Sequence, residues 1–200
     1  TRIETGEVGL RIGFDKQVSG AELQPGSFNQ TMFGDVITFP VREIKVSIDD
    51  RKPITADNSV LSDFDFTVIY SITPSAVSDL WTTKSRGFHV FDEKHKDWYL
   101  MLNYIDTVAN SAAFKAVRKH DVLKINDARA QLETDIKQLI TQALQDEKLA
   151  AAITINQVQV RNVVIDKQVA DSAAAVIRSQ NELKQKQIDV QTAQQEALRI

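Results

Sequence analysis

The chain has 200 residues, of which 42% are hydrophobic and 26% are charged, and its formal net charge is −3. This balance is typical of a soluble chain of one domain or two small ones, and it lacks the basic excess of a nucleic-acid-binding surface. The absence of cysteine excludes disulfides, thiolate zinc sites and a cysteine nucleophile. Glycine, proline and aromatic residues all disappear after Phe114. The chain is therefore not uniform in structure along its length.

Residues 1–72 have the pattern of short β-strands separated by glycine and proline. Apolar and polar residues alternate over residues 8–12, 44–48 and 64–70, and a period of two indicates half-buried strands. Pro25-Gly26 predicts a tight turn, because proline presets φ for one turn position and glycine accepts a positive φ at the next. We therefore expect a β-rich subdomain with an antiparallel sheet over residues 1–72.

The spacing of apolar residues becomes helical after Pro74. Helices are expected over residues 76–81, 98–120 and 127–151. Asn126 or Asp127 is a suitable N-cap for the last of these. The stretch from 153 to 165 is rich in β-branched residues and alternates again, with two phase slips, so it predicts a strand. Residues 73–166 thus form a predicted α+β subdomain.

Residues 167–200 are predicted to form one helix that starts a coiled coil. Asp166 is a suitable N-cap, and no helix breaker follows it. Valine and leucine recur at intervals of seven, which defines one seam position of a coiled coil, but glutamine fills most of the companion positions. Because half of the seam is polar, we expect this helix to pack beside many copies rather than in a lone pair. The predicted seam consists of Val169, Ala173, Val176, Gln180, Leu183, Gln187, Val190 and Ala197.

Histidine residues suggest two catalytic or metal sites, and each has a simpler explanation. His89 and His95, with two carboxylates between them, are possible zinc ligands, but their spacing is not that of a known site and a solvated loop is favoured. His120 beside Asp121 suggests a general base, but the end of a helix explains it better. No phosphate-binding loop, dinucleotide fingerprint or nucleophile elbow occurs. We therefore predict a protein that is not an enzyme, with no catalytic, cofactor-binding or metal-binding residues and no cofactor.

The densest group of aromatic residues lies between residues 81 and 99. Large aromatic side chains dominate protein cores, so packing between the two halves of the chain is the favoured interpretation. Contact with a membrane or a partner is the alternative, because tryptophan and other aromatic residues also gather at such surfaces. The residues concerned are Trp81, Phe88, Phe91 and Trp98.

Several short motifs occur in a characteristic order along almost the whole chain. They are Glu7-Val8-Gly9-Leu10, Leu23-Gln24-Pro25-Gly26, Thr55-Ala56-Asp57-Asn58, the run from Phe64 to Ile72, and the run from Ile153 to Val163, followed by a helix rich in alanine and glutamine. In this order and spacing they resemble the SPFH family, also called band 7, which includes stomatins, prohibitins and paired bacterial protease regulators.

The resemblance implies an α+β fold: an SPFH-type domain with an antiparallel β-rich part and an α/β part, followed by a long C-terminal helix that starts a coiled coil. It also implies a non-catalytic, membrane-associated scaffold that self-assembles laterally into ring- or cage-like oligomers and organises or regulates membrane proteins. The alternative is a dedicated regulatory subunit that binds one membrane protease or envelope complex.

No apolar run approaches the roughly 20 residues that a membrane-spanning helix needs. From the resemblance we expect an anchor N-terminal to Thr1, a coiled coil that continues past Ile200, and a place in the bacterial cell envelope. Val8, Leu10, Phe14 and the region 28–39 would then lie near lipid. The expected partners are other copies of the chain, the membrane and a membrane protease, but not nucleic acid.

Overall fold

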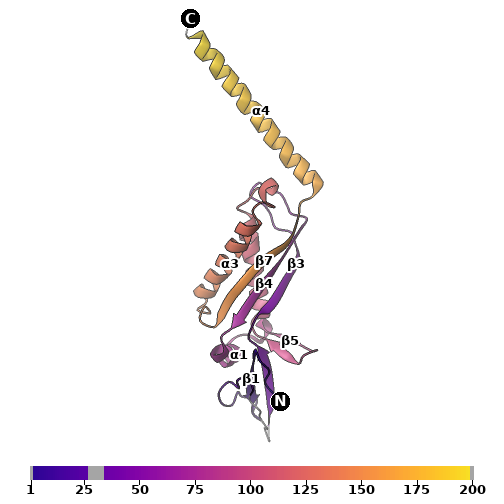
Figure 1. Ribbon diagram of the computed structural model, residues 1–200, viewed down its shortest axis with the longest axis vertical. Helices are drawn as coiled ribbons and strands as arrows, with labels where there is room; N and C mark the ends of the chain where they lie inside the picture. The colour runs from indigo at the N-terminus through magenta and orange to yellow at the C-terminus, as the bar shows by residue number, and fades with distance from the viewer. Residues whose placement is uncertain (1, 27–33, 199–200) are drawn as a thin grey trace.

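The computed structural model describes residues 2–26 and 34–198. It shows an elongated molecule in which a long helix projects from a body of two sheets and several helices (Figure 1). The helix leaves the body at the end opposite strand β1 (Figure 1). The predicted α+β class and the long C-terminal helix are therefore confirmed.

The first sheet lies at the end of the body farthest from the long helix (Figure 1). Its strands, in spatial order, are β1 (Glu7–Ile12), β2 (Asp35–Pro40), β6 (Asp97–Tyr99) and β5 (Val90–Asp92). Two of its pairings are antiparallel, whereas β2 and β6 run parallel and meet at Thr38 and Asp97. The Thr38 hydroxyl donates a hydrogen bond to the buried Asp97 carboxylate there. Only β1 was expected from the sequence, because the others are short or lack alternation.

The second sheet contains three antiparallel strands, with β4 in the centre. They are β3 (Ile44–Arg51), β4 (Asp63–Ile72) and β7 (Ile153–Val164). All three were predicted. Strands from the two predicted subdomains, 1–72 and 73–166, pair with each other in both sheets, and the division at this boundary stays a prediction.

The two phase slips predicted for β7 are β-bulges. Its pairing with β4 shifts register at Asn156 and at Arg161, so that each is an extra residue in the strand. Without them, strict alternation would turn part of the apolar set toward solvent. The Arg161 guanidinium binds the Asp49 carboxylate, and the Asn156 amide donates to the Ser71 hydroxyl at 2.6 Å.

In chain order the helices are η1 (Pro74–Ala76), α1 (Val77–Thr83), η2 (Arg86–Phe88), α2 (Leu102–Val117), η3 (Val122–Lys124), α3 (Arg129–Asp146) and α4 (Lys167–Ala197). Of these, α2 and α3 pack on the second sheet, whereas α4 projects from the body (Figure 1). Helix α2 packs against α3, and they contact β3 and β7 respectively. The predicted N-cap at Asn126 or Asp127 is wrong: Ala128 caps α3 without a side-chain bond, because one further turn precedes the helix.

A continuous hydrophobic core joins the two sheets and the helices. Tyr70 ties its centre to the start of α2, since the buried hydroxyl donates to the Leu100 carbonyl at 2.6 Å. Val8 and Leu10 are also buried in this core, so the expectation that they face lipid is wrong. Of the region 28–39, residues 28–33 lie outside the described part of the chain.

Helix α3 covers the outer edge of β7 with two charged side chains. The Glu133 carboxylate accepts from the Val160 N–H at 3.0 Å, and the Lys137 ammonium donates to the Asn156 carbonyl at 3.3 Å. These bonds satisfy backbone groups that would otherwise be open to another strand.

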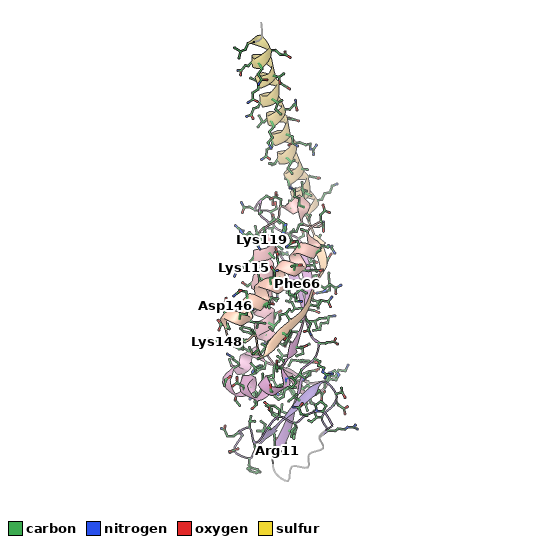
Figure 2. The ribbon with its side chains drawn as sticks, turned by 60° about the vertical axis from the view of Figure 1, so that its left-hand side comes forward. Arg11, Phe66, Lys115, Lys119, Asp146 and Lys148 are labelled. Carbon is green, nitrogen blue, oxygen red and sulfur yellow. The ribbon has the colours of Figure 1, made fainter. Side chains whose placement is uncertain are left out.

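Replacing Phe66 by alanine tests this core. Phe66 is fully buried in the middle of β4, within the body (Figure 2), so Phe66→Ala should lower the free energy of unfolding by about 3–5 kcal/mol. Phe14→Ala is the matched control, because that side chain is 87% exposed and its loss should cost less than about 0.5 kcal/mol. Urea denaturation measures both, and equal losses would contradict the placement of Phe66.

Candidate functional site on the long C-terminal helix

Helix α4 begins at a well-formed N-cap. The Asp166 carboxylate accepts from the N–H groups of Gln168 and Val169 at 2.8 and 3.3 Å, which confirms the predicted cap. Such a cap contributes about 1 kcal/mol, and it places the start of the helix directly after β7. Thirty-one residues then follow without a break in the helix.

The first turns of α4 rest on the body. Val169 and Ala173 are partly buried and pack against the hydrophobic core, and the helix contacts η3 at this point. These two residues belong to the predicted seam. The N-terminal end of the seam therefore already packs against the body of the same chain.

Beyond these turns the apolar stripe of α4 is uncovered. The side chains of Val176, Leu183 and Val190 are 57%, 59% and 56% exposed. Ile177 and Ile188 form a second exposed row beside them. Figure 2 shows side chains projecting from all sides of this helix, away from the body. The structure thus places the seam residues Gln180, Leu183, Gln187, Val190 and Ala197 on a free helix, and their contact with other copies stays a prediction.

Beneath the start of α4, hydrogen bonds join the loop that follows β3 to the segment that contains η3. The Asp57 carboxylate accepts from the Thr55 hydroxyl at 2.5 Å and from the Val122 N–H at 3.2 Å. The Ala56 N–H also donates to the His120 carbonyl at 2.9 Å. The loop after β3 is thereby joined to η3. Sequence reasoning used Thr55-Ala56-Asp57-Asn58 only as part of a resemblance and did not predict this role.

The aromatic cluster is largely a packing unit next to the first sheet. Trp81 contacts Phe39 and Trp98, with ring centroids 5.2 and 5.1 Å apart, and both tryptophans are only partly exposed. The Arg86 guanidinium lies over the Trp98 ring at 4.9 Å. This is the core-packing interpretation that the sequence favoured.

Two phenylalanines of the cluster remain at the surface. Phe88 and Phe91 are exposed, although Phe88 contacts Tyr104 and Phe91 contacts Trp98. The Lys96 ammonium is 5.9 Å from the centroid of the Phe91 ring. Contact of these residues with a membrane or a partner stays a prediction.

The two histidines considered as metal ligands have separate roles. His89 is only 5% exposed, so the predicted solvated loop is wrong for this residue. Its ring stacks on Trp81, and its Nδ1 accepts from the Met101 N–H at 3.0 Å. His95 is exposed and its Nδ1 lies 2.6 Å from the Asp92 carboxylate. The spacing of the two residues therefore reflects one packed ring and one surface pair.

Among the described residues, one group has a geometry that suits a cation. Carboxylate oxygens of Asp50, Asp63 and Asp65 lie within 4.8 Å of one another. Asp63, however, accepts from the Asn162 amide at 2.9 Å, and Asp65 accepts from the Asp50 N–H at 2.8 Å. These bonds account for the positions of two of the three carboxylates, and we assign no metal to them.

His89 makes the stability of the body depend on pH. Burial lowers the pKa of His89, the positive charge of Arg86 lowers it further, and the backbone of Leu80 acts in the opposite direction. Below about pH 6.5 the unfolded chain binds a proton that the folded chain resists, so stability should fall as the pH decreases from 7 to 5. Thermal unfolding of His89→Gln, which keeps an acceptor for Met101, should show a weaker pH dependence in this range. His95→Gln should retain the dependence, and an unchanged profile in both variants would contradict this role of His89.

The comparison with protein families gives a match over residues 1–197 to the model of the SPFH domain / Band 7 family. A comparison with curated proteins found no match. No helix in residues 2–26 and 34–198 is both long and apolar enough to cross a bilayer. Members of the matched family generally act as membrane-associated scaffolds or regulators and are generally not enzymes. Since the match covers nearly all of the sequence and agrees with the fold, the chain belongs to the SPFH domain / Band 7 family.

Proposed function

We propose that this chain is a non-catalytic scaffold that assembles laterally through α4 into ring- or cage-like oligomers at a membrane and there organises or regulates membrane proteins. The exposed apolar stripe of α4 carries the proposal. A helix normally buries its apolar stripe against a neighbour, whereas the valine and leucine side chains of α4 face water over several turns. The general role of the family supports the membrane location.

The composition of the stripe favours an assembly of many copies. Val176, Leu183 and Val190 are each about half exposed, and full burial of such a side chain contributes about 1.5–3 kcal/mol. Association of two molecules costs an estimated 4–15 kcal/mol in lost translational and rotational freedom. In a single pair of helices, the free energy gained by burying the seam therefore exceeds the cost of association by little. In a closed ring each copy contacts two neighbours, which suits the weak seam.

The exposed charges of α4 lie mainly away from the stripe. Lys184 and Lys186 occupy the positions beside the seam, whereas Arg178 lies on the opposite face of the helix, and all three are exposed. Charged residues beside a coiled-coil seam help to set the register and orientation of neighbouring helices. A protease or envelope complex regulated by such an assembly remains a proposal that the resemblance alone supports.

Charged substitutions in the seam test this function. Val176→Asp combined with Leu183→Asp should abolish assembly, because each carboxylate would be buried against an apolar neighbour without a partner. Light scattering of the purified chain on lipid vesicles or in detergent measures the particle size. The control is Ala175→Asp combined with Gln185→Asp, which adds the same charge outside the seam.

The control should keep the size of the wild-type particle, and circular dichroism should show equal helix content in both double variants. A wild-type chain that stays monomeric at all concentrations would refute the scaffold. A seam variant that assembles like the wild type would remove α4 from the proposal.

A further inference from the structure

A groove lies between the first turns of α4 and the body beneath it. It has a volume of about 1030 Å³ and is open to solvent along one side. The loop 57–60 and the residues around η3 form the body side, and α4 forms the other. The α4 residues that line it are Gln168, Val169, Ser172, Ala173, Val176, Ile177 and Gln180.

Apolar side chains from separate segments meet at this groove. Val60, from the loop before β4, is 46% exposed, and Leu123, from η3, is 38% exposed. Val176 and Ile177 face them from α4 and are also exposed. The groove thus brings together exposed apolar side chains from a loop, a short helix and a long helix.

The charged residues of the groove lining are Asp57, Asp121 and Lys124, which together carry a net charge of −1. The Asp57 carboxylate also accepts hydrogen bonds from the Thr55 hydroxyl and the Val122 N–H. The remaining polar lining residues are amides and hydroxyls. A ligand of strong negative or positive charge, such as a nucleic acid or an anionic lipid surface, has no complement here. An amphipathic helix with apolar and glutamine side chains does.

We propose that this groove receives helix α4 of a second copy of the chain. Val176 lines the groove and is also a seam residue, so the groove continues directly into the exposed stripe of the same helix. The stripe supplies the valine, leucine and glutamine side chains that such a weakly charged, partly apolar groove accepts. Because the seam alone leaves little surplus for association, Val60 and Leu123 add the apolar surface that it lacks.

This contact rests on the proposed lateral assembly and makes it directional. The groove of one copy takes the helix of the next, whose own groove remains free for a third copy. Contacts of this head-to-tail kind continue from copy to copy and close into a ring when the rotation between neighbours permits. The body, and not the helix alone, would then determine how neighbours are oriented.

Matched lysine substitutions on the body test the groove. Leu123 and Phe114 are both 38% exposed, but Phe114 lies on α2 outside the groove, beside Lys115 (Figure 2). Leu123→Lys should raise the apparent dissociation constant of the assembly at least tenfold, whereas Phe114→Lys should leave it unchanged. Val60→Lys probes the other segment on the body side of the groove and should act like Leu123→Lys, so the test does not depend on the folding of one variant.

The absence of cysteine allows a second, direct test. Leu123→Cys copies are mixed with Leu183→Cys copies of different tag length and treated with a short bis-maleimide. A heterodimer should form, and Phe114→Cys in place of Leu123→Cys should give none. If α4 variants abolish assembly while Leu123→Lys and Val60→Lys do not and no heterodimer forms, the groove proposal is overturned and the scaffold stands. A wild-type chain that never assembles overturns both.

Discussion

The pairing of β7 with β4 is the constraint on which the rest of the molecule depends. It brings the last strand of the body back to the first half of the chain, and the Ser62 N–H bonds the Val164 carbonyl at 2.9 Å where β7 ends. This point determines where α4 begins, two residues later at the Asp166 cap. The loop 57–60 precedes β4 by a few residues, so the same pairing places it beside the base of the helix. The groove is a consequence of this arrangement.

The sequence predicted those elements whose side chains carry a period. In β7 even the irregularities were visible, because each phase slip of the β-branched residues corresponds to a bulge. Strands β5 and β6 have three residues each, too few for any period; they pair with each other, and β6 also pairs with β2, which is far away in the sequence. The start of α2 was misplaced for the same reason, since Asp97–Tyr99 pair as a strand instead of joining the helix.

The candidate site was predictable in one half only. The stripe of α4 follows from heptad spacing, which is a local property of the helix. The body side of the groove does not, because Val60 and Leu123 come together through hydrogen bonds between segments far apart in the sequence, from the Val122 N–H to Asp57 and from the Ala56 N–H to the His120 carbonyl. An exposed leucine in a short connecting turn gives no signal by itself. His89 was likewise taken for a loop residue, because its burial results from the stacked Trp81 ring and not from a local pattern.

The side chains that cover the outer edge of β7 matter when many copies of the chain lie close together. The proposed scaffold would concentrate many identical bodies, and each of them has sheet edges whose backbone groups are able to recruit a foreign strand. At β7, Glu133 and Lys137 already occupy two of those groups, and both charges would have to leave their partners before another strand added there. The same two side chains that finish the fold of one molecule thus protect a dense population of it against amyloid-like fusion through this edge.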